Sequence, residues 1–133
     1  MIKHLTVPTA FLMMISSQVS AFDTAHLQKL KDTNNTPACF QCDLRKAQLS
    51  GADLGSAWLA DADLYDANLN GAYLKYAWMP RANLESANLS EANLNNANLG
   101  EANLFGADLS GANLSKAYLN YAVIEGAILC NTT

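Results

Sequence analysis

The chain has 133 residues, a length typical of one domain, and three residue types dominate it: 22 Ala, 20 Leu and 14 Asn. A hydrophobic content of 50% excludes a disordered chain, because ample apolar surface is available for burial. A formal net charge of −4 lacks the basic footprint of a nucleic-acid-binding protein, so no nucleic-acid partner is expected. The narrow composition indicates a repeated structural unit.

Residues 1–21 follow the order of a secretory signal peptide. A weakly basic start precedes the apolar stretch 5–15, and small residues precede a predicted cleavage site after Ala21. The apolar stretch is too short to cross a bilayer, which takes about 20 residues. We therefore expect an exported protein, periplasmic or secreted, whose mature chain 22–133 has no transmembrane segment.

Residues 22–41 are predicted to form a short N-terminal capping helix and a linker. Leu27 and Leu30 lie three apart on one helix face, and Pro37 disfavours helix at the residue before it. His26 is the only histidine after the predicted cleavage site. It is interpreted as a surface residue, because a Ser-His-Asp arrangement would lack its orienting partners there.

Residues 42–131 repeat every five positions without insertion or deletion, and 132–133 form a tail. Ala recurs at every fifth position from 47 to 127, and Leu two positions later, from 44 to 129, with two exceptions. A helix would place successive Leu residues about 140° apart, so they would share no face. A strand places Ala and Leu on one face, but an odd period would turn every second unit outward. The chain must therefore turn once per unit, with Ala and Leu inside.

Correlations between residues that lie four units apart indicate that four units make one coil. Trp58 and Trp78 occupy the same slot of the unit. The charge alternates in sign at the same spacing, through Asp61, Arg81 and Glu101.

Three runs, Ala82-Asn83-Leu84, Ala92-Asn93-Leu94 and Ala107-Asp108-Leu109, resemble the A(D/N)Lxx unit of the pentapeptide-repeat proteins. The resemblance implies an all-β fold, a right-handed quadrilateral β-helix in which Leu and the small residue two before it point inward. Four units per coil and 18 units give about 4.5 coils. The Cys-x-x-Cys before the repeats also resembles the start of the repeats in exported bacterial members.

The register of the repeats determines which cysteines can pair. Cys130 lies 17 units beyond Cys42, or about 20 Å along the stack. A disulfide needs Cα atoms within about 7 Å. We therefore predict a disulfide between Cys39 and Cys42, with Cys130 free or intermolecular.

No catalytic, cofactor-binding or metal-binding residues are predicted, and the protein is not expected to be an enzyme. The Cys-x-x-Cys has no second ligand pair for zinc and no βαβ context for redox chemistry. Asp61, Asp63 and Asp66 lack the glycine and terminal glutamate of a calcium loop. They are interpreted as a solvated acidic surface.

Aromatic residues gather on one side of the expected coil. On the fourth face, the slot before Leu holds an aromatic residue in three of four successive coils, with two tyrosines nearby. This candidate interaction patch comprises Trp58, Trp78, Tyr118, Tyr73 and Tyr76, with Asn98 in the slot between Trp78 and Tyr118. Two interpretations stay open: a stacking ladder that stabilises the coil, and a docking patch for a protein or carbohydrate.

The last coil carries apolar residues, Val123 and Ile128, in outward slots. They mark a candidate self-association end, through which the chain forms a homodimer, or else a single exposed edge.

These observations predict a non-enzymatic exported protein that acts as a rigid scaffold or protein-interaction surface for an unknown protein or envelope component. One alternative is a carbohydrate or cell-envelope binding module that uses the outward Trp/Tyr face. A second alternative comes from the resemblance, because some family members inhibit type II topoisomerases as DNA mimics. The repeats here carry 5 basic and 10 acidic residues, a weak charge for such mimicry.

Overall fold

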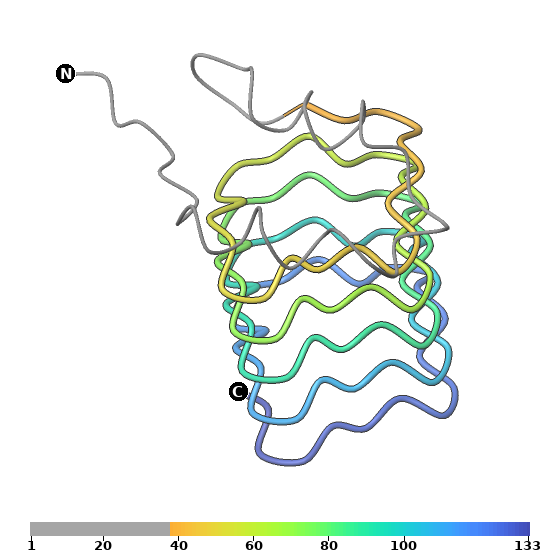
Figure 1. The fold of residues 1–133 in the computed structure, drawn as a ribbon. Coiled ribbons are helices and arrows are strands. Elements are labelled where there is room, and N and C mark those ends of the chain that lie inside the picture. The colour runs from red at the N-terminus through yellow and green to blue at the C-terminus, as the bar shows by residue number, and fades with distance from the viewer. Residues whose placement is uncertain (1–37) are drawn as a thin grey trace, which may run out of the picture.

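The structure, a computed structural model, describes residues 38–133, which wind into a stack of coils running from orange to blue in Figure 1. The expected signal peptide, His26 and nearly all of the predicted capping helix and linker lie outside the described residues. The described part contains no α-helix, and thus residues 38–133 include no helix long and apolar enough to cross a membrane.

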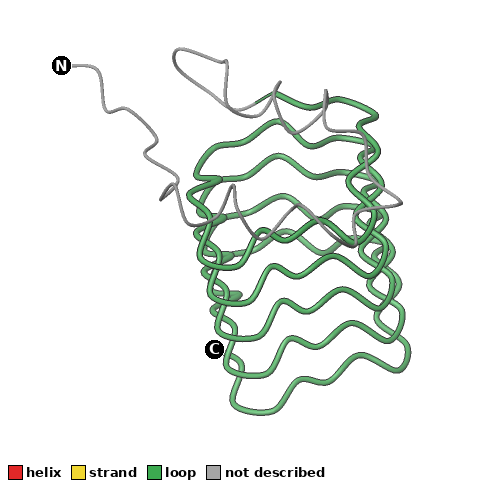
Figure 2. Ribbon diagram, viewed as in Figure 1, coloured by secondary structure: helices red, strands yellow, loops and turns green. Residues whose placement is uncertain are grey.

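Each coil consists of four units and has four sides, because each outward slot from Ala38 to Asp108 is bridged in parallel to the slot four units later. The bridges are isolated pairs and not extended strands, so Figure 2 shows turns and loops throughout. We name the four sides faces A to D by the residues that precede Leu. Face A holds Asp43, Asp63, Asn83, Asn103 and Val123; face B holds Gln48, Asn68, Asn88, Asp108 and Ile128; face C holds Asp53, Tyr73, Asn93 and Asn113; face D holds Ala38, Trp58, Trp78, Asn98 and Tyr118.

The core consists of the two inward columns that the period of five predicts. The Leu column is buried from Leu44 to Leu109, with Met79 fully buried in a Leu position. The Ala column is buried beside it as far as Ala112, apart from the partly buried Ala52. No polar or charged residue of the described part is buried. The inward placement of both columns is thus confirmed.

The backbone hydrogen bonds explain why Asn or Asp so often precedes Leu. Four N–H groups of a unit bond to backbone carbonyls: three to adjacent coils and one across the turn that follows Leu. The fifth N–H group of the unit belongs to the residue directly after Leu. It donates instead to the side chain of the Asn or Asp directly before Leu. In one such unit, the Asn93 side-chain oxygen accepts a hydrogen bond from the Asn95 N–H at 3.1 Å. The same bond recurs in 11 units, so each Asn or Asp satisfies a backbone donor that the coil leaves over.

Every corner of the coil has left-handed backbone at the second residue after Leu, which has positive φ throughout. A type II turn requires positive φ at its third position, where Gly or Asn is usual. Here the position also holds Lys46, Tyr76 and Glu101, with φ of 59°, 61° and 60°. Such residues bear a cost of about 1–2 kcal/mol each. Their conformation is imposed by the hydrogen bonds that hold each corner between neighbouring coils.

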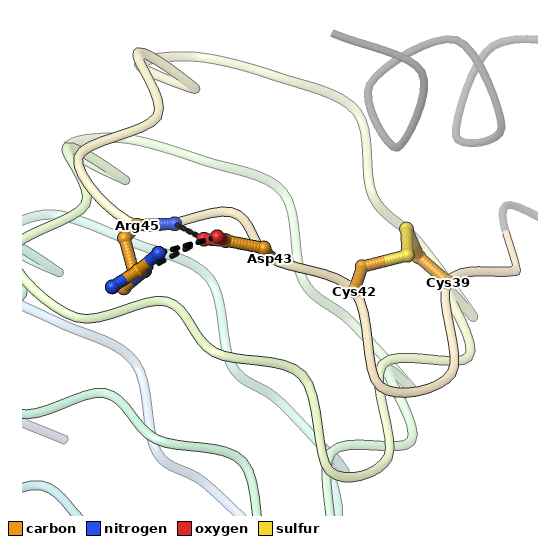
Figure 3. Close-up of a disulfide and its surroundings, with 4 residues drawn as sticks. All are labelled: Cys39, Cys42, Asp43 and Arg45. Atoms are coloured by element: carbon orange, nitrogen blue, oxygen red, sulfur yellow. Dashed lines mark hydrogen bonds and ion pairs between the residues drawn. A yellow bond between two sulfur atoms is a disulfide. The ribbon is translucent and has the colours of Figure 1, made fainter. Parts of the chain in front are cut away.

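The coil geometry is already present at Ala38, the first described residue, ahead of the predicted start of the repeats at Cys42. Ala38 is bridged to Trp58, and the Gln41 corner already has a φ of 56°. This occurs because Cys39 takes the position of Leu and Cys42 the position of Ala, and both are buried. The predicted pair lies within disulfide distance, with the Cα atoms 5.3 Å apart and the sulfur atoms joined across the turn (Figure 3).

Candidate interaction face

Face D is an aromatic, uncharged side of the coil. Trp58, Trp78, Asn98 and Tyr118 occupy its outward slots in successive coils and are linked by parallel bridges. The exposed fractions of the three aromatic residues are 62%, 48% and 52%. The second row of this face, directly after Leu, is also uncharged throughout. It consists of Phe40, Ala60, Pro80, Gly100 and Asn120.

In the Trp78 unit, a proline takes the place of the residue whose N–H would otherwise donate to an Asn or Asp side chain. A tryptophan in the outward slot offers no oxygen to the N–H that follows Leu. After Trp78 that residue is Pro80, which has no N–H and favours the second position of a type II turn. The Trp78 unit therefore leaves no donor unsatisfied at this position.

Side chains in the outward slots lean toward the preceding coil, where they reach the residue that follows Leu. A Cβ atom added to Gly55 would lie 2.9 Å from Cε1 of Tyr73, and one added to Gly100 would lie 3.2 Å from Cε1 of Tyr118. Asn103 follows the same direction, since its amide donates to a Glu85 carboxylate oxygen at 3.1 Å. This packing has a sequence signal that periodicity alone does not reveal. The signal is a small residue directly after Leu, one coil before an outward aromatic residue.

The side-chain hydrogen-bond donors of face D make no hydrogen bond within residues 38–133, in contrast to side-chain donors on faces A and B. Within residues 38–133, neither the indole N–H of Trp58 and Trp78, nor the amide donor of Asn98, nor the Tyr118 hydroxyl makes a hydrogen bond. On face A, by contrast, Asn83 donates to Asp63 at 2.9 Å. On face B, Asn68 donates to Gln48 at 3.1 Å. Face D thus combines exposed rings with donors available to a ligand.

The two remaining aromatic residues of the predicted patch lie beside face D. Tyr73 occupies the adjacent face C, and Tyr76 forms the corner between the two faces. The Lys75 ammonium lies 5.1 Å from the centre of the Tyr76 ring, within cation–π distance. The structure therefore brings all five predicted aromatic residues to two neighbouring sides.

The charges at the other corner of face D are largely paired. Arg81 donates two hydrogen bonds to the Asp61 carboxylate, both at 2.7 Å. These hydrogen bonds and the positive charge hold the pKa of Asp61 below its usual value. The pKa of Arg81 is raised mainly by the hydrogen bond with Asp61 and by the charge of Asp61. The charge of Glu101 makes a smaller contribution in the same direction. The alternating charges seen in the sequence thus form one ion pair with a more distant third member.

The acidic residues of the first coils are dispersed. Asp61 bonds to Arg81, while Asp63 accepts hydrogen bonds from the Asn83 side chain and the Tyr65 N–H. In the part of the chain that the structure describes, no three His, Cys, Asp or Glu side chains lie close enough together to hold a metal ion.

The C-terminal coil leaves part of the core uncovered. Ile124 and Leu129 belong to the inward column, yet they are 48% and 44% exposed. The outward Val123 and Ile128 are exposed as well, and the Cys130 thiol is free and exposed. Backbone groups that bond to a following coil elsewhere in the stack find no such partner here within residues 38–133. They include the N–H groups of Leu119, Ile124 and Leu129 and the carbonyls of Ala117, Ala122 and Ala127.

Known proteins with the same repeat match most of the described chain. The family model for pentapeptide repeats matches residues 42–76, 67–104 and 97–133, with eight copies. A pentapeptide-repeat protein of the Arabidopsis thaliana thylakoid lumen is 34% identical, with a TM-score of 0.49 over 62% of this chain and 61% of its own. Rfr23 of the cyanobacterium Cyanothece 51142 is 37% identical, with a TM-score of 0.37 over 65% and 62%.

HetL of Nostoc sp. strain PCC 7120, a protein involved in the regulation of heterocyst differentiation, is 30% identical, with a TM-score of 0.30 over 71% of this chain and 58% of its own. The chain thus spans about three-fifths of the length of these three proteins. A comparison with curated protein sequences finds no match. With most of its length matched by the repeat, the chain belongs to the pentapeptide-repeat family, and its four-sided stack of parallel bridges is the β-helix expected of that family.

Proposed function

We propose that this chain is a non-enzymatic exported protein that acts as a rigid interaction surface, with face D as the docking side. One observation carries this proposal: the aromatic side chains of the coil concentrate on an uncharged face whose hydrogen-bond donors are unused. Trp and Tyr are the residues that most often anchor protein interfaces. A contiguous exposed apolar patch on a soluble protein commonly marks an interaction site.

The coil holds this face in a fixed shape. The outward residues of face D from Trp58 to Asn98 are bridged to both neighbouring coils, and the Leu column behind them is fully buried through most of the stack. A rigid face loses little conformational entropy on binding, so more of the contact energy is retained as affinity.

Two features support export. Residues 1–21 follow the order of a signal peptide. The Cys39–Cys42 pair lies at disulfide distance, and disulfides persist in oxidising compartments. Cell fractionation and N-terminal sequencing of the purified protein test the export: a cytosolic chain that retains residue 1 would refute it.

Affinity capture from the envelope fraction tests the docking role of face D. The wild type is compared with a Trp58→Ala/Trp78→Ala variant and with a Tyr65→Ala/Phe105→Ala control, which removes two exposed rings from face A. We expect the Trp variant to lose the captured component and the control to keep it, with similar thermal midpoints for all three proteins. Loss of thermal stability without loss of capture would instead favour a stacking ladder.

We also propose that the C-terminal coil pairs with a second copy of the chain. The unpaired N–H and C=O groups of this coil alternate along its edge, so two copies related by a two-fold axis satisfy each other's donors and acceptors. Its two charged residues, Lys116 and Glu125, have opposite sign, so the pairing brings no net repulsion.

Light scattering coupled to gel filtration measures this self-association. Val123→Asn and Ile128→Asn restore the residue type common in outward slots, so the coil itself should remain folded. We expect a dimer for the wild type and a monomer for the double variant. A wild-type monomer at high concentration, or an unchanged dimer in the variant, would exclude this interface.

The DNA-mimic alternative receives less support from the charges. Of the acidic side chains, Asp43 and Asp61 are ion-paired with Arg45 and Arg81 (the first pair is drawn in Figure 3). A gyrase supercoiling assay separates the two functions, because strong inhibition by the purified chain would favour mimicry over docking.

A further inference from the structure

We propose that face D binds a neutral, extended polysaccharide of the β-1,4-linked type, laid along the axis of the coil. The inference rests on the proposed role of face D as the docking side and names the chemistry of its partner. It starts from the two rows of side chains on this face, which together form a strip of rings and small residues.

The strip has the components of a sugar-binding platform. Trp58, Trp78 and Tyr118 present exposed rings, against which the apolar C–H faces of pyranose rings stack. The indole N–H groups, the Asn98 side-chain N–H groups and the Tyr118 hydroxyl are free of other partners in the described part of the chain, while the Asn98 oxygen accepts a hydrogen bond from the Gly100 N–H. They can therefore bond sugar hydroxyls without breaking an existing interaction.

The spacing and shape of the strip favour an extended chain. The outward slots of face D recur once per coil, at about 4.8 Å along the axis. An extended β-1,4-linked chain is a flat ribbon that advances by a similar distance per sugar, so one sugar can occupy each coil. The second-row residues Ala60, Pro80 and Gly100 are small, and the Tyr118 ring leans over Gly100, so no large side chain rises beside the rings at these positions. An α-1,4-linked chain is curved, so it would bend away from this straight strip and contact only part of it.

The charges of the molecule disfavour nucleic acids and anionic lipid surfaces as partners of face D. Neither row of face D contains a charged residue, and the chain has a net charge of −4. Nucleic acids and anionic lipid surfaces are attracted by clustered Lys and Arg, which this face lacks. Trp and Tyr also anchor protein interfaces, so the distinction from a protein partner rests on the axial spacing of the strip and is decided by the test with oligosaccharide probes.

The test uses the intrinsic fluorescence of the purified chain, because its only two tryptophans lie on face D. Cellohexaose and chitohexaose serve as neutral probes, and hexamannuronate serves as a charged β-1,4-linked chain of the same length. We expect a saturable change in tryptophan emission with at least one neutral probe and at least tenfold weaker binding of hexamannuronate. Equal binding of the charged probe, or no response to either neutral probe, would overturn the inference.

A conservative variant keeps the result independent of folding. Asn98→Asp retains the oxygen that accepts the Gly100 N–H at 2.9 Å but removes the amide donor and adds a charge. Asp53, Asp63 and Asp108 already make this bond in other units, so the coil tolerates the change. We expect severalfold weaker binding of the neutral probe, whereas the matched Asn113→Asp variant on face C should bind normally. Equal binding by both variants would contradict a site on face D.

The Trp58→Ala/Trp78→Ala variant separates this inference from the proposed docking role. Calorimetry should detect no binding of the neutral probes to it. If the wild type binds neither probe but the Trp variant still loses capture of an envelope component, the docking role stands and the glycan inference fails.

Discussion

The hydrogen bond between Asn93 and the N–H of Asn95 can be removed without disturbing the core. In an Asn93→Ala variant the side-chain oxygen that lies 3.1 Å from this N–H is lost. The Asn93 side chain points outward, between Tyr73 and Asn113 in the neighbouring coils. The backbone bonds of the unit to those coils are unaffected, so the variant isolates the contribution of the Asn side chain.

The expected loss follows from the surroundings of Asn95. A net hydrogen bond contributes about 0.5–1.5 kcal/mol, and a donor left buried without a partner costs about 1–3 kcal/mol. Because Asn95 is only partly buried, water reaches part of this site, and we expect a loss of about 1–1.5 kcal/mol. For a domain of this size, that corresponds to a decrease of roughly 4–12 °C in Tm.

Thermal unfolding followed by circular dichroism measures the loss, with Asn93→Asp as the matched control. The aspartate keeps the accepting oxygen, as Asp63 does for the Tyr65 N–H at 3.1 Å. We expect the control to unfold close to the wild type and the Ala variant to unfold earlier. Equal Tm values for the Ala variant and the wild type would refute the stabilising role assigned to this bond.

Three further outcomes follow from the core, the disulfide and the ion pairs. Ala87→Leu overfills a fully buried position and should lower the free energy of unfolding by about 1–3 kcal/mol, measured by urea denaturation. An unchanged midpoint would place Ala87 outside the core. Reduction of Cys39–Cys42 should cost about 2 kcal/mol, the loop-closure value for so short a loop, and equal Tm values with and without reductant would contradict it. The pKa of Asp61 is lowered by the hydrogen bond from Arg81, so its stabilisation is complete above about pH 4 and is lost as pH falls through the lower folded pKa. The stabilities of the wild type and Asp61→Asn should therefore converge in acid, and a difference that grew toward low pH would contradict this sign.

Much of the fold followed from the spacing of two residue types. The period of five excluded a helix, and the two-residue spacing of Ala and Leu required both to face inward, where Leu44 to Leu109 lie buried. The correlation of Trp58 with Trp78 indicated the coil of four units that their parallel bridge shows. Sequence also assigned the aromatic residues to neighbouring sides, because the register of an unbroken repeat fixes the side of every residue.

Other features of the candidate site depended on contacts between coils. Sequence spacing alone did not indicate that Tyr118 leans over Gly100, since the two belong to successive coils and meet only when one coil stacks on another. Nor did alternating charge indicate that Arg81 forms its ion pair with Asp61 and not with Glu101. The direction in which an outward side chain leans is set by the packing of the coils.

The sequence by itself determined the inward columns, the length of the coil and the side on which each aromatic residue lies, because these depend only on periodicity. The tertiary structure decided the conformation of the corners and the role of the Asn residues. Tyr76 and Glu101 have left-handed backbone against their own preference, because the hydrogen bonds between adjacent coils hold the chain at each turn. Those same bonds leave one N–H per unit without a backbone acceptor, and this is why a short side-chain oxygen before Leu stabilises the coil.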